Sequence, residues 1–262
     1  MGASYRPRYA FSAAFATKLT KSSKSVMFKP MPANQQLSPA ELGALNLRFE
    51  SAEPQEIIEW ALAEFGDGLS VGASFGGASG MAILHMVATR KPNIDVFVLD
   101  TDYLFQETYE TMAQTEAALG LQNLNVYKPQ LTHEEQAKQH GAALWMRDPD
   151  LCCEIRKVEP NRRALEGKTA WVSGLRRDQS ERRADIPIVT WNEKFAVVKL
   201  HPLANWDEKR TWAYLLQNNV PYNPLLNHGF TSIGCYNCTV PGKQGRAGRW
   251  EGFDKEECGL HT

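Results

Sequence analysis

The five cysteines constrain this chain more than any other feature of its sequence. Four of them form two close pairs, the adjacent Cys152 and Cys153 and the pair Cys235 and Cys238. The fifth, Cys258, stands alone near the C-terminus in the sequence Glu-Glu-Cys-Gly-Leu-His. Two pairs indicate one metal site with four thiolate ligands, so the fold has to bring the pairs together. A lone cysteine on a short polar tail indicates a mobile nucleophile.

The spacing of the paired cysteines bears on which metal they bind. Four thiolates can hold zinc or an iron–sulfur cluster. Structural zinc sites commonly use two Cys-x-x-Cys loops around one ion, whereas Cys152 and Cys153 have no spacer and project in different directions. Such a pair suits a cubane better than a single tetrahedral ion, and Lys157, one helical turn further on, can balance its charge. The spacing favours a cluster, and zinc or four unligated cysteines remain the alternatives.

Composition and charge argue against several classes of protein. The 262 residues are enough for one α/β domain with small additions. The net charge of −1 provides no global electrostatic reason to bind nucleic acid or a membrane. No apolar run approaches the roughly 18–20 residues that span a bilayer. An odd number of cysteines, two of them adjacent, does not suit a disulfide framework and favours a reducing compartment.

The first 36 residues differ from the rest of the chain. From Met1 to Ala40 there are six basic residues and no acidic one, and serine and alanine are frequent. This composition is typical of an organellar transit peptide, and equally of a disordered tail ahead of a later start at Met27 or Met31. We favour the tail and set residues 1–36 apart from the fold. The expected location is cytoplasmic, with an organelle stroma as the alternative if the segment is a transit peptide.

The rest of the chain alternates strand and helix patterns. Strands are predicted at 69–74, 94–99, 123–127, 169–175 and 195–201, and helices at 39–49, 53–65, 81–90, 105–119, 131–140, 158–165 and 206–218. The alternation predicts an α/β domain over 37–240 with a mainly parallel sheet. Ligands of such sheets bind beyond the carboxyl ends of the strands, where residues 74–80 and 100–102 both fall. Residues 241–262 are poor in apolar side chains, and we expect them to form a mobile tail.

Two segments have the composition of anion sites. Ser74 to Gly80 joins a strand to a helix, and a glycine-rich turn of this kind exposes backbone N–H groups at the helix N-terminus. Arg176 to Arg183 carries four arginines in eight residues at the end of a strand, which suits a polyanion. The alternatives are a tight turn and a solvated charged turn, and neither segment is specific by itself.

The lone Cys258 would need to reach its thiolate form near neutral pH in order to react. Free cysteine titrates at roughly 8.5, and basic neighbours lower that pKa. The adjacent Glu256 and Glu257 act in the opposite direction. Activation therefore has to come from residues that meet the tail when it closes, such as Lys157 or the arginines. An incidental tail cysteine is the alternative.

Five motifs in a fixed order carry a specific resemblance. They are Cys-Cys-Glu-Ile-Arg-Lys-Val-Glu-Pro at 152–160, Gly-Leu-Arg-Arg-Asp-Gln-Ser at 174–180, Gly-Cys-Tyr-Asn-Cys at 234–238, Gly-Arg-Ala-Gly-Arg-Trp at 245–250 and Glu-Cys-Gly-Leu-His at 257–261. From about residue 40 to its end the chain resembles the assimilatory adenylyl-sulfate (APS) reductases. These belong to the family that also contains the phosphoadenylyl-sulfate (PAPS) reductases.

The resemblance implies an oxidoreductase of sulfate assimilation and cysteine biosynthesis that reduces APS to sulfite and AMP, with thioredoxin as electron donor. It implies a Rossmann-like sheet of the adenine nucleotide alpha hydrolase-like type, with a flexible C-terminal tail whose Cys258 becomes an S-sulfonate. The four paired cysteines would hold a [4Fe-4S] cluster. The implied substrate-binding residues are Ser74, Phe75, Gly76, Gly77 and Ser79 in the phosphate loop, Leu99, Asp100 and Thr101 beside the adenosine, and Lys157, Arg183, Arg246, Arg249 and His261 at the phosphosulfate or the closed tail.

The chain departs from the usual family pattern at two places near the implied nucleotide. Ser79 and Gly80 stand where acidic residues are usual, and Asp102 stands where glycine is usual. These changes bear on the choice between APS and PAPS. The cysteine pairs favour APS because the PAPS-specific members lack them, and PAPS reduction or dual activity is the alternative. We expect dependence on a separate thioredoxin and no nucleic-acid or membrane partner; a homo-oligomer stays open.

Two other functions remain in competition with the reductase. An ATP pyrophosphatase of the same fold, such as a tRNA-thiolating enzyme, would need an ATP-type loop and usually a basic surface for RNA. The loop Ser-Phe-Gly-Gly-Ala-Ser-Gly and the near-neutral charge disfavour it. A non-enzymatic iron–sulfur or zinc sensor would use the four paired cysteines, and Cys258 would then be dispensable.

Overall fold

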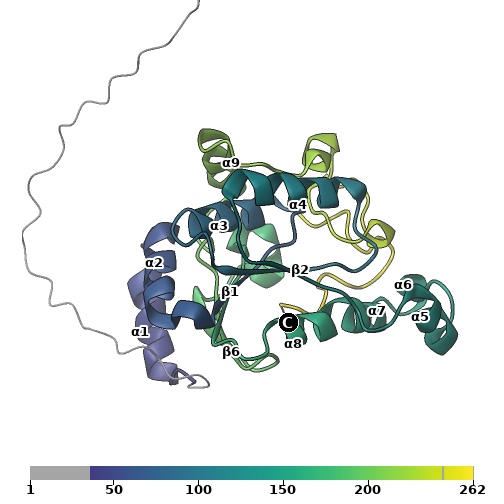
Figure 1. Ribbon diagram of the computed structural model, residues 1–262, viewed down its shortest axis with the longest axis horizontal. Helices are drawn as coiled ribbons and strands as arrows, with labels where there is room; N and C mark the ends of the chain where they lie inside the picture. Colours follow the sequence, from purple (N-terminus) through teal and green to yellow (C-terminus); the bar gives the residue numbers. More distant parts are fainter. Residues whose placement is uncertain (1–35, 244, 262) are drawn as a thin grey trace, which may run out of the picture.

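The computed structural model describes residues 36–243 and 245–261, and its centre is one twisted sheet (Figure 1). In this part of the chain the sheet has six strands in the order β3-β2-β1-β4-β6-β5. The strands are β1 (Leu69–Gly72), β2 (Asp95–Leu99), β3 (Leu124–Tyr127), β4 (Ala170–Val172), β5 (Val189–Asn192) and β6 (Val197–Leu200). Every neighbouring pair is parallel except β5 and β6. The predicted α/β class and mainly parallel sheet are confirmed.

The antiparallel strand β5 was not predicted from the sequence. Its four residues, Val-Thr-Trp-Asn, lie at the edge of the sheet, and three of them are only half-buried. So short and partly exposed a strand shows neither a buried apolar run nor a clear alternation. The predicted strand at 69–74 is also shorter in the structure, because the backbone leaves the sheet after Gly72 and turns into the glycine-rich loop.

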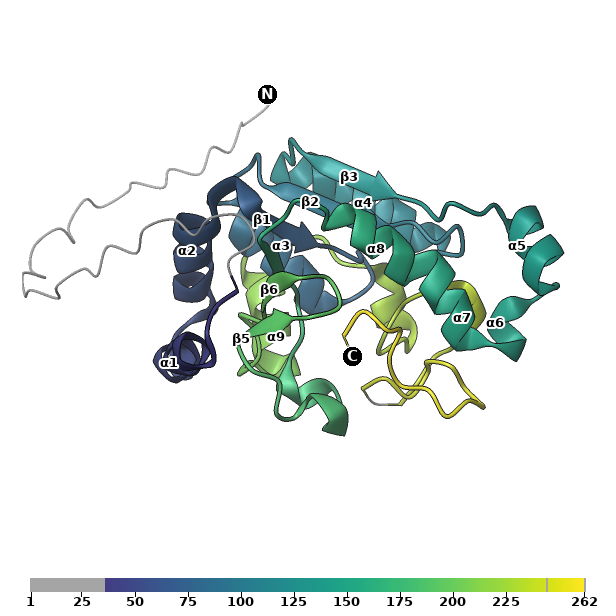
Figure 2. The same ribbon diagram turned by 90° about the horizontal axis from the view of Figure 1, so that it is seen from below.

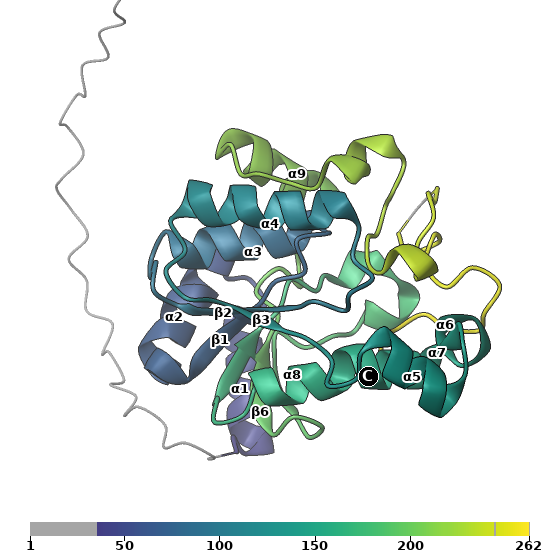
Figure 3. The same cartoon turned by 45° about the vertical axis from the view of Figure 1, so that its right-hand side comes forward.

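Helices cover both faces of the sheet (Figures 1 and 3). On one face lie α3 (Ala78–Ala88), α4 (Gln106–Leu119) and α9 (Glu208–Gln217). On the other lies α8 (Glu159–Ala164), whose Ala164 packs in a small core with Phe97 and Trp171. The helix α2 (Pro54–Phe65) packs beside α3 and β1, and α1 (Pro39–Phe49) packs against β5. This layered arrangement leaves the carboxyl ends of the parallel strands open for a ligand.

The α1 helix protects the sheet edge at β5. Ser38 caps α1 in a reciprocal capping box with Glu41, as the predicted helix start requires. From this helix Asn46 reaches the edge strand, where its Oδ1 accepts a hydrogen bond from the Val189 N–H at 3.0 Å and its Nδ2 donates to the Val189 carbonyl at 2.7 Å. The side chain therefore replaces a missing neighbouring strand at this residue.

A lobe of short helices extends beyond the sheet, at the right of Figure 2. It consists of α5 (His133–His140), α6 (Leu144–Arg147) and α7 (Pro149–Cys153). The chain then continues through a π-helical turn, Glu154–Val158, directly into α8. The sequence predicted a helix over 158–165, whereas the first cysteine pair already ends a helix that this wide turn extends. Wide turns of this kind are frequent at functional sites.

The C-terminal segment after residue 240 is folded against the rest of the protein. In Figures 1 and 2 it runs from beside α6 and α7 back to α8, where the chain ends. We expected a mobile tail because the segment contains few apolar residues. The structure shows one packed position, held by charged and polar contacts, and movement away from it stays a prediction. The tail or transit peptide predicted for residues 1–36 lies outside the described residues, apart from Gln36. No helix in the described part is both long and apolar enough to cross a membrane.

Candidate active site

A large cleft opens at the carboxyl ends of the central strands. Its volume is about 1520 Å³, and it is lined by the loop after β1, the end of β2, the segment after β4 and the C-terminal tail. Ligand pockets commonly have volumes of roughly 300–1,000 Å³, so the cleft has room for a nucleotide. Of the residues implied in substrate binding, those that line it are Ser74, Gly77, Ser79, Leu99, Thr101, Lys157, Arg183, Arg246, Arg249 and His261, together with Cys258.

The loop after β1 brings an uncapped helix N-terminus to this cleft. Gly77 is the N-cap of α3 and provides no side-chain cap, so the first N–H groups of the helix remain available to a ligand. The segment after β4 approaches closely: a Cβ atom on Gly174 would lie 2.8 Å from the Gly80 nitrogen, which only glycine avoids. Ser79 accepts a hydrogen bond from Arg176 at 2.5 Å. The predicted strand–turn–helix geometry is therefore confirmed.

Three of the residues implied in substrate binding do not line the cleft. Phe75 is buried in the core with a positive φ of 51°. A Cβ atom on Gly76 would lie 2.9 Å from the Ile233 carbonyl, so this glycine is needed for close packing. Asp100 is buried and accepts a hydrogen bond from the Tyr109 hydroxyl at 2.7 Å. These three residues shape the loops, and the cleft-facing side chains come from their neighbours.

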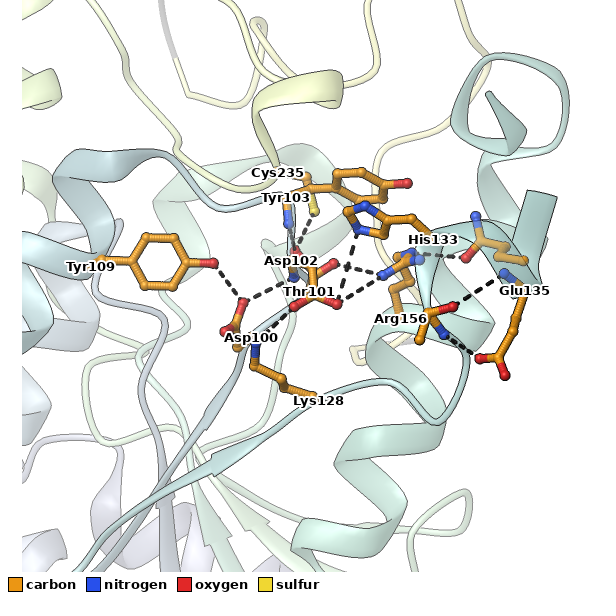
Figure 4. Close-up of polar contacts among 12 residues, drawn as sticks. Asp100, Thr101, Asp102, Tyr103, Tyr109, Lys128, His133, Glu135, Arg156 and Cys235 are labelled. Atoms are coloured by element: carbon orange, nitrogen blue, oxygen red, sulfur yellow. Dashed lines mark hydrogen bonds and ion pairs between the residues drawn. The ribbon is translucent and has the colours of Figure 1, made fainter. Parts of the chain in front are cut away.

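The unusual Asp102 lies in a charged network behind the cleft (Figure 4). Its φ is 58°, a left-handed conformation that aspartate tolerates better than most residues. The carboxylate lies 2.9 Å from the Lys128 ammonium and 3.4 Å from the Arg156 guanidinium. Arg156 is almost fully buried and also donates to the Thr101 carbonyl at 3.0 Å. The acidic residue at this position therefore balances a buried cation, which the usual glycine would not do.

The two cysteine pairs meet on one wall beside the cleft. Cys152, Cys153, Cys235 and Cys238 all line a single small cavity, as the sequence predicted that they must. The Thr101 hydroxyl lies 3.2 Å from the Cys235 sulfur, which links the end of β2 to this cavity (Figure 4). Within the described residues no three His, Cys, Asp or Glu side chains converge as ligands of a single metal ion.

The chemistry of these thiols indicates what the cavity needs. Burial raises the pKa of Cys152 to about 12 and that of Cys153 to about 11. Burial also raises the pKa of Cys238, and the neighbouring Cys235 adds to the effect. These three thiols would therefore need a bound cation in order to ionise near neutral pH. Four cysteines that line one cavity provide a donor set that can hold zinc or an iron–sulfur cluster.

Two cations lie between the cysteine cavity and the cleft. Lys157 lines both and projects from the π-helical turn. Burial lowers its pKa, but the sulfurs of Cys235, Cys153 and Cys258 raise it by more, so the lysine stays charged. Arg249 donates from Nε to the Cys238 carbonyl at 3.3 Å, while its buried NH2 group has no partner within the described residues. An unpaired buried guanidinium nitrogen favours an anionic ligand at this place.

The tail is held by cations on both sides of Cys258. Before it, Arg183 donates to both carboxylate oxygens of Glu257 at 2.6 and 2.8 Å, and Arg246 donates to the Glu256 carbonyl. After it, Lys194 donates to the Gly259 carbonyl and Lys199 to the Leu260 carbonyl, both at 3.0 Å. These contacts place the half-buried Cys258 sulfur in the cleft.

The surroundings of Cys258 activate its thiol. Burial raises its pKa, but Lys157, the Leu260 N–H and the Arg246 guanidinium together lower it by more, so the net shift is downward. Activation by Lys157 and the arginines agrees with the expectation from the sequence. The opposing effect expected from Glu257 is offset, because Arg183 pairs with that carboxylate.

His261 stabilises the tail and is uncharged. Its ring stacks on Trp171 with 5.5 Å between centroids, and its Nδ1 lies 2.8 Å from the Lys199 ammonium nitrogen. Burial, aided by the nearby Lys199 and Arg183 charges, holds the pKa of His261 well below its usual range. It can therefore donate one hydrogen bond to a ligand but contributes no positive charge.

The arginine run after β4 is already paired with carboxylates. Arg176 pairs with Asp178, Arg177 with Glu50, Arg182 with Glu256 and Arg183 with Glu257. The first two pairs connect parts of the scaffold, and the last two connect to the tail. The geometry therefore does not present all four arginines to one polyanion. Arg183 is the one that pairs with the residue before Cys258.

Two residues that contact the tail were missed from the sequence. Trp171 in β4 and Lys199 in β6 lie inside predicted strands, and the sequence assigns them no further role. Both side chains are buried, and both contact His261 of the tail. The Lys199 ammonium also lies 4.3 Å from the centre of the Trp171 ring. The available signal was a lysine in the middle of the apolar strand Val-Val-Lys-Leu, which is unusual for a buried position.

Comparisons with known proteins agree with this geometry. The phosphoadenosine phosphosulfate reductase domain family matches residues 69–241. The adenosine 5′-phosphosulfate reductase of Salinibacter ruber is 47% identical over 86% of this chain and 90% of its own length. The adenosine 5′-phosphosulfate reductase 1 of Bacillus subtilis is 43% identical over 78% of this chain and 89% of its own length.

Solved structures show the same fold. A Candida auris phosphoadenylyl-sulfate reductase, solved as a phosphate complex, superimposes with a TM-score of 0.70 at 35% identity. The match covers 79% of this chain and 99% of that one. A Candida glabrata FMN adenylyltransferase gives a TM-score of 0.54 at 16% identity, covering 80% of this chain and 69% of that one, which is a likeness of fold alone.

Proposed function

The chain belongs to the phosphoadenosine phosphosulfate reductase domain family, and from this premise we propose that it reduces APS to sulfite and AMP in sulfate assimilation. The observation that carries the proposal is the position of Cys258, which lies in a nucleotide-sized cleft with Lys157 and two arginines close enough to lower its pKa. A thiolate among cations is suited to attack an anionic substrate. The curated relatives at 40–47% identity carry the name of the same activity.

The proposed reaction has two steps in which Cys258 changes its partner. The Cys258 thiolate attacks the sulfur of APS, a sulfur–sulfur bond forms, and the bond from that sulfur to the phosphate oxygen breaks. AMP leaves with the electron pair of the broken bond, and Cys258 carries an S-sulfonate. A thioredoxin thiolate then attacks the Cys258 sulfur and sulfite leaves. The second thioredoxin thiol closes a disulfide and frees the Cys258 thiolate, so the thioredoxin dithiol provides the two electrons.

The residues that line the cleft have separate parts in this reaction. The uncapped N-terminus of α3 and its loop bind a phosphate, and the ends of β1 and β2 border the adenosine. Lys157 and Arg249 face the negative charge of the phosphosulfate, which grows on the phosphate oxygen as AMP departs. The stacked His261 and the ring of Trp171 fix the tail at its far end.

The four paired cysteines are proposed to hold a [4Fe-4S] cluster, and the support is their place around a common cavity. A cluster held by four protein thiolates has no open iron position, so when bound it supplies charge and a rigid scaffold rather than a binding place for substrate. Iron and acid-labile sulfide analysis of the purified protein tests this assignment. We expect about four irons per chain, and stoichiometric zinc would replace the cluster in the proposal.

Thioredoxin as the electron donor requires the tail to leave the cleft, because the Cys258 sulfur is half-buried in the closed position. Among the described residues after Cys238 there is no regular helix or strand, and the contacts around Cys258 are mainly polar. Such a segment can open at a modest cost in free energy and return to the same place.

A single adduct tests the function. The purified protein is incubated with APS without a reductant, and the C-terminal peptide is analysed by mass spectrometry. We expect an added SO₃ group on Cys258 and one equivalent of AMP released. A protein that binds APS but forms no adduct would contradict the reductase, and a Cys258→Ser variant that still produced sulfite with thioredoxin would exclude Cys258 as nucleophile.

PAPS is the second candidate substrate, because the Candida auris structure of 35% identity is named for it. PAPS carries an additional phosphate on the ribose, so the two nucleotides differ by a charge that the protein has to accept or reject. We expect a higher kcat/KM for APS, in line with the curated relatives. Kinetics with both nucleotides and one thioredoxin decide between them.

A further inference from the structure

Arg183 and Glu257 form a buried ion pair next to Cys258. Arg183 is 5% exposed and Glu257 is 8% exposed. The guanidinium donates to both carboxylate oxygens, and its remaining NH1 group donates to Gln179 at 2.5 Å. A second cation, the Arg246 guanidinium, lies 3.5 Å from the same carboxylate. Each of the three guanidinium nitrogens of Arg183 therefore already donates one hydrogen bond.

A carboxylate held in this way has the contacts that a substrate anion would need. A planar guanidinium binds a carboxylate, a phosphate or a sulfate with the same two parallel hydrogen bonds. The buried Arg183 guanidinium would be costly without an anion, because burial removes the solvent around its charge, and the half-buried Arg246 adds a second positive charge beside it. Glu257 removes that cost in the substrate-free protein, and it is directly attached to the nucleophile.

We propose that Glu257 occupies the phosphosulfate site of the free enzyme, and that the substrate anion displaces it from Arg183 and Arg246. This inference rests on the proposed function, since it assigns those arginines to the same substrate. Binding of the substrate then releases the part of the tail before Cys258, while Lys194 and Lys199 still hold the part after it. The nucleophile becomes free to turn toward the sulfur only when an anion has replaced Glu257.

A matched pair of variants tests the displacement. Glu256 is the preceding residue and has the same charge, but it is exposed and pairs at 2.9 Å with the exposed Arg182. In a Cys258→Ser background, which prevents turnover, APS affinity is measured by calorimetry on the full chain. We expect Glu257→Gln to tighten the Kd by about tenfold, since coupling within close charge pairs reaches that size. Glu256→Gln should change it by less than about twofold, as for exposed pairs.

A third variant separates displacement from a simple change of charge near the site. Glu257→Asp keeps the charge but is one methylene too short for the same two hydrogen bonds. If Glu257 has to be displaced, the aspartate variant should bind APS more tightly than the parent and less tightly than Glu257→Gln. An affinity equal to the parent in both Glu257 variants, or an equal effect of Glu256→Gln, would overturn the proposal.

A measurement without substrate distinguishes failure of this inference from failure of the proposed function. In the Cys258-containing protein, the rate of alkylation by iodoacetamide is followed to its plateau at high pH, where only access to the sulfur matters. Glu257→Gln should raise this plateau and Glu256→Gln should not. If the plateau rises but no variant binds APS, the tail contact is real and the proposed substrate is wrong. The parent protein can also bind APS while Glu257→Gln changes neither the alkylation plateau nor the Kd for APS. In that case the proposed function stands, and Glu257 does not occupy the phosphosulfate site.

Discussion

At the scale of single residues, the reactivity of Cys258 depends on charges that other parts of the chain provide. The two residues before it in the sequence are acidic, and by themselves they would oppose its ionisation. The net lowering of its pKa comes from Lys157 on the π-helical turn, from the Leu260 N–H and from Arg246 and Arg249. A cysteine is reactive where such positive groups surround it. Leu260, Arg246 and Arg249 belong to the C-terminal segment itself, whereas Lys157 lies outside it, so Cys258 meets Lys157 only when the tail is closed.

The first prediction concerns the pH dependence of Cys258 alkylation. The fold lowers the pKa of the Cys258 thiol. The alkylation rate of Cys258 should therefore reach half its plateau at a pH below roughly 8.5, the usual pKa of a free cysteine. Lys157→Met removes the first of the groups that lower the pKa, so the midpoint should move to higher pH. Lys243→Met removes an exposed lysine from the rim of the same cleft and should leave the midpoint unchanged. Equal midpoints in all three proteins would show that Lys157 does not activate the thiol.

At the scale of elements, two features position the site without touching a ligand. The π-helical turn after α7 widens the helix where the first cysteine pair ends, and it directs Arg156 toward Thr101 and Lys157 toward the cleft. Successive residues of an ordinary helix point about 100° apart, and the extra residue in a π turn changes which of them face the core. Asp102 then balances the buried Arg156 from the end of β2.

The second prediction concerns the protection of the sheet edge by α1. Asn46→Ala removes both hydrogen bonds to the backbone of Val189, a residue that is 1% exposed. Leaving a buried backbone N–H and carbonyl unpaired should lower the free energy of unfolding by about 1–3 kcal/mol. Asn227→Ala, which loses only a long 3.4 Å contact to the Tyr222 hydroxyl at the surface, serves as the control. Urea denaturation of both variants measures the difference, and equal losses would contradict the role of Asn46.

At the scale of the whole molecule, the sheet and the C-terminus are joined through Lys199. This lysine is buried in β6, lies over the Trp171 ring and donates to the tail at Leu260. Burial lowers the pKa of Lys199 to about 7. The position of the last residues of the chain is therefore connected to the protonation of a side chain in the middle of the sheet.

The third prediction follows from this pKa. Between pH 7 and the ordinary lysine value of about 10.4, the unfolded chain binds a proton at Lys199 that the folded chain does not. The free energy of unfolding should therefore rise with pH in this window, by at most about 1.4 kcal/mol per pH unit from this residue. Below pH 7 both states are protonated and the contribution stops changing.

The variant Lys199→Met removes this proton, so its stability should rise less steeply with pH than that of the parent. Chemical denaturation at several pH values between 6 and 10 gives both slopes. Comparing slopes avoids the separate loss of the hydrogen bond to Leu260, which shifts the whole curve of the variant. Parallel curves would show that Lys199 keeps an ordinary pKa in the folded protein.

The sequence predicted the sheet class, most helices and the convergence of the cysteine pairs, because each of these has a local or compositional signal. Strand and helix periodicities depend on neighbours two to four residues away, which any single sequence displays. The edge strand β5 and the roles of Trp171 and Lys199 had no such signal. A four-residue strand is too short for periodicity, and a strand residue's function depends on what covers it.

The sequence by itself determined the α/β alternation of this protein, the thiols available to it and the existence of a separate C-terminal cysteine. Only the tertiary structure decided which charged side chains form pairs with one another and which of them contact the tail. Arg183 and Glu257 are separated by 74 residues along the chain, and Lys199 and the Leu260 carbonyl by 61. A run of arginines looks the same in a sequence whether each one faces solvent, a carboxylate or a substrate. The choice among these depends on burial and distance, which arise only when the sheet brings the ends of its strands and the tail to one cleft.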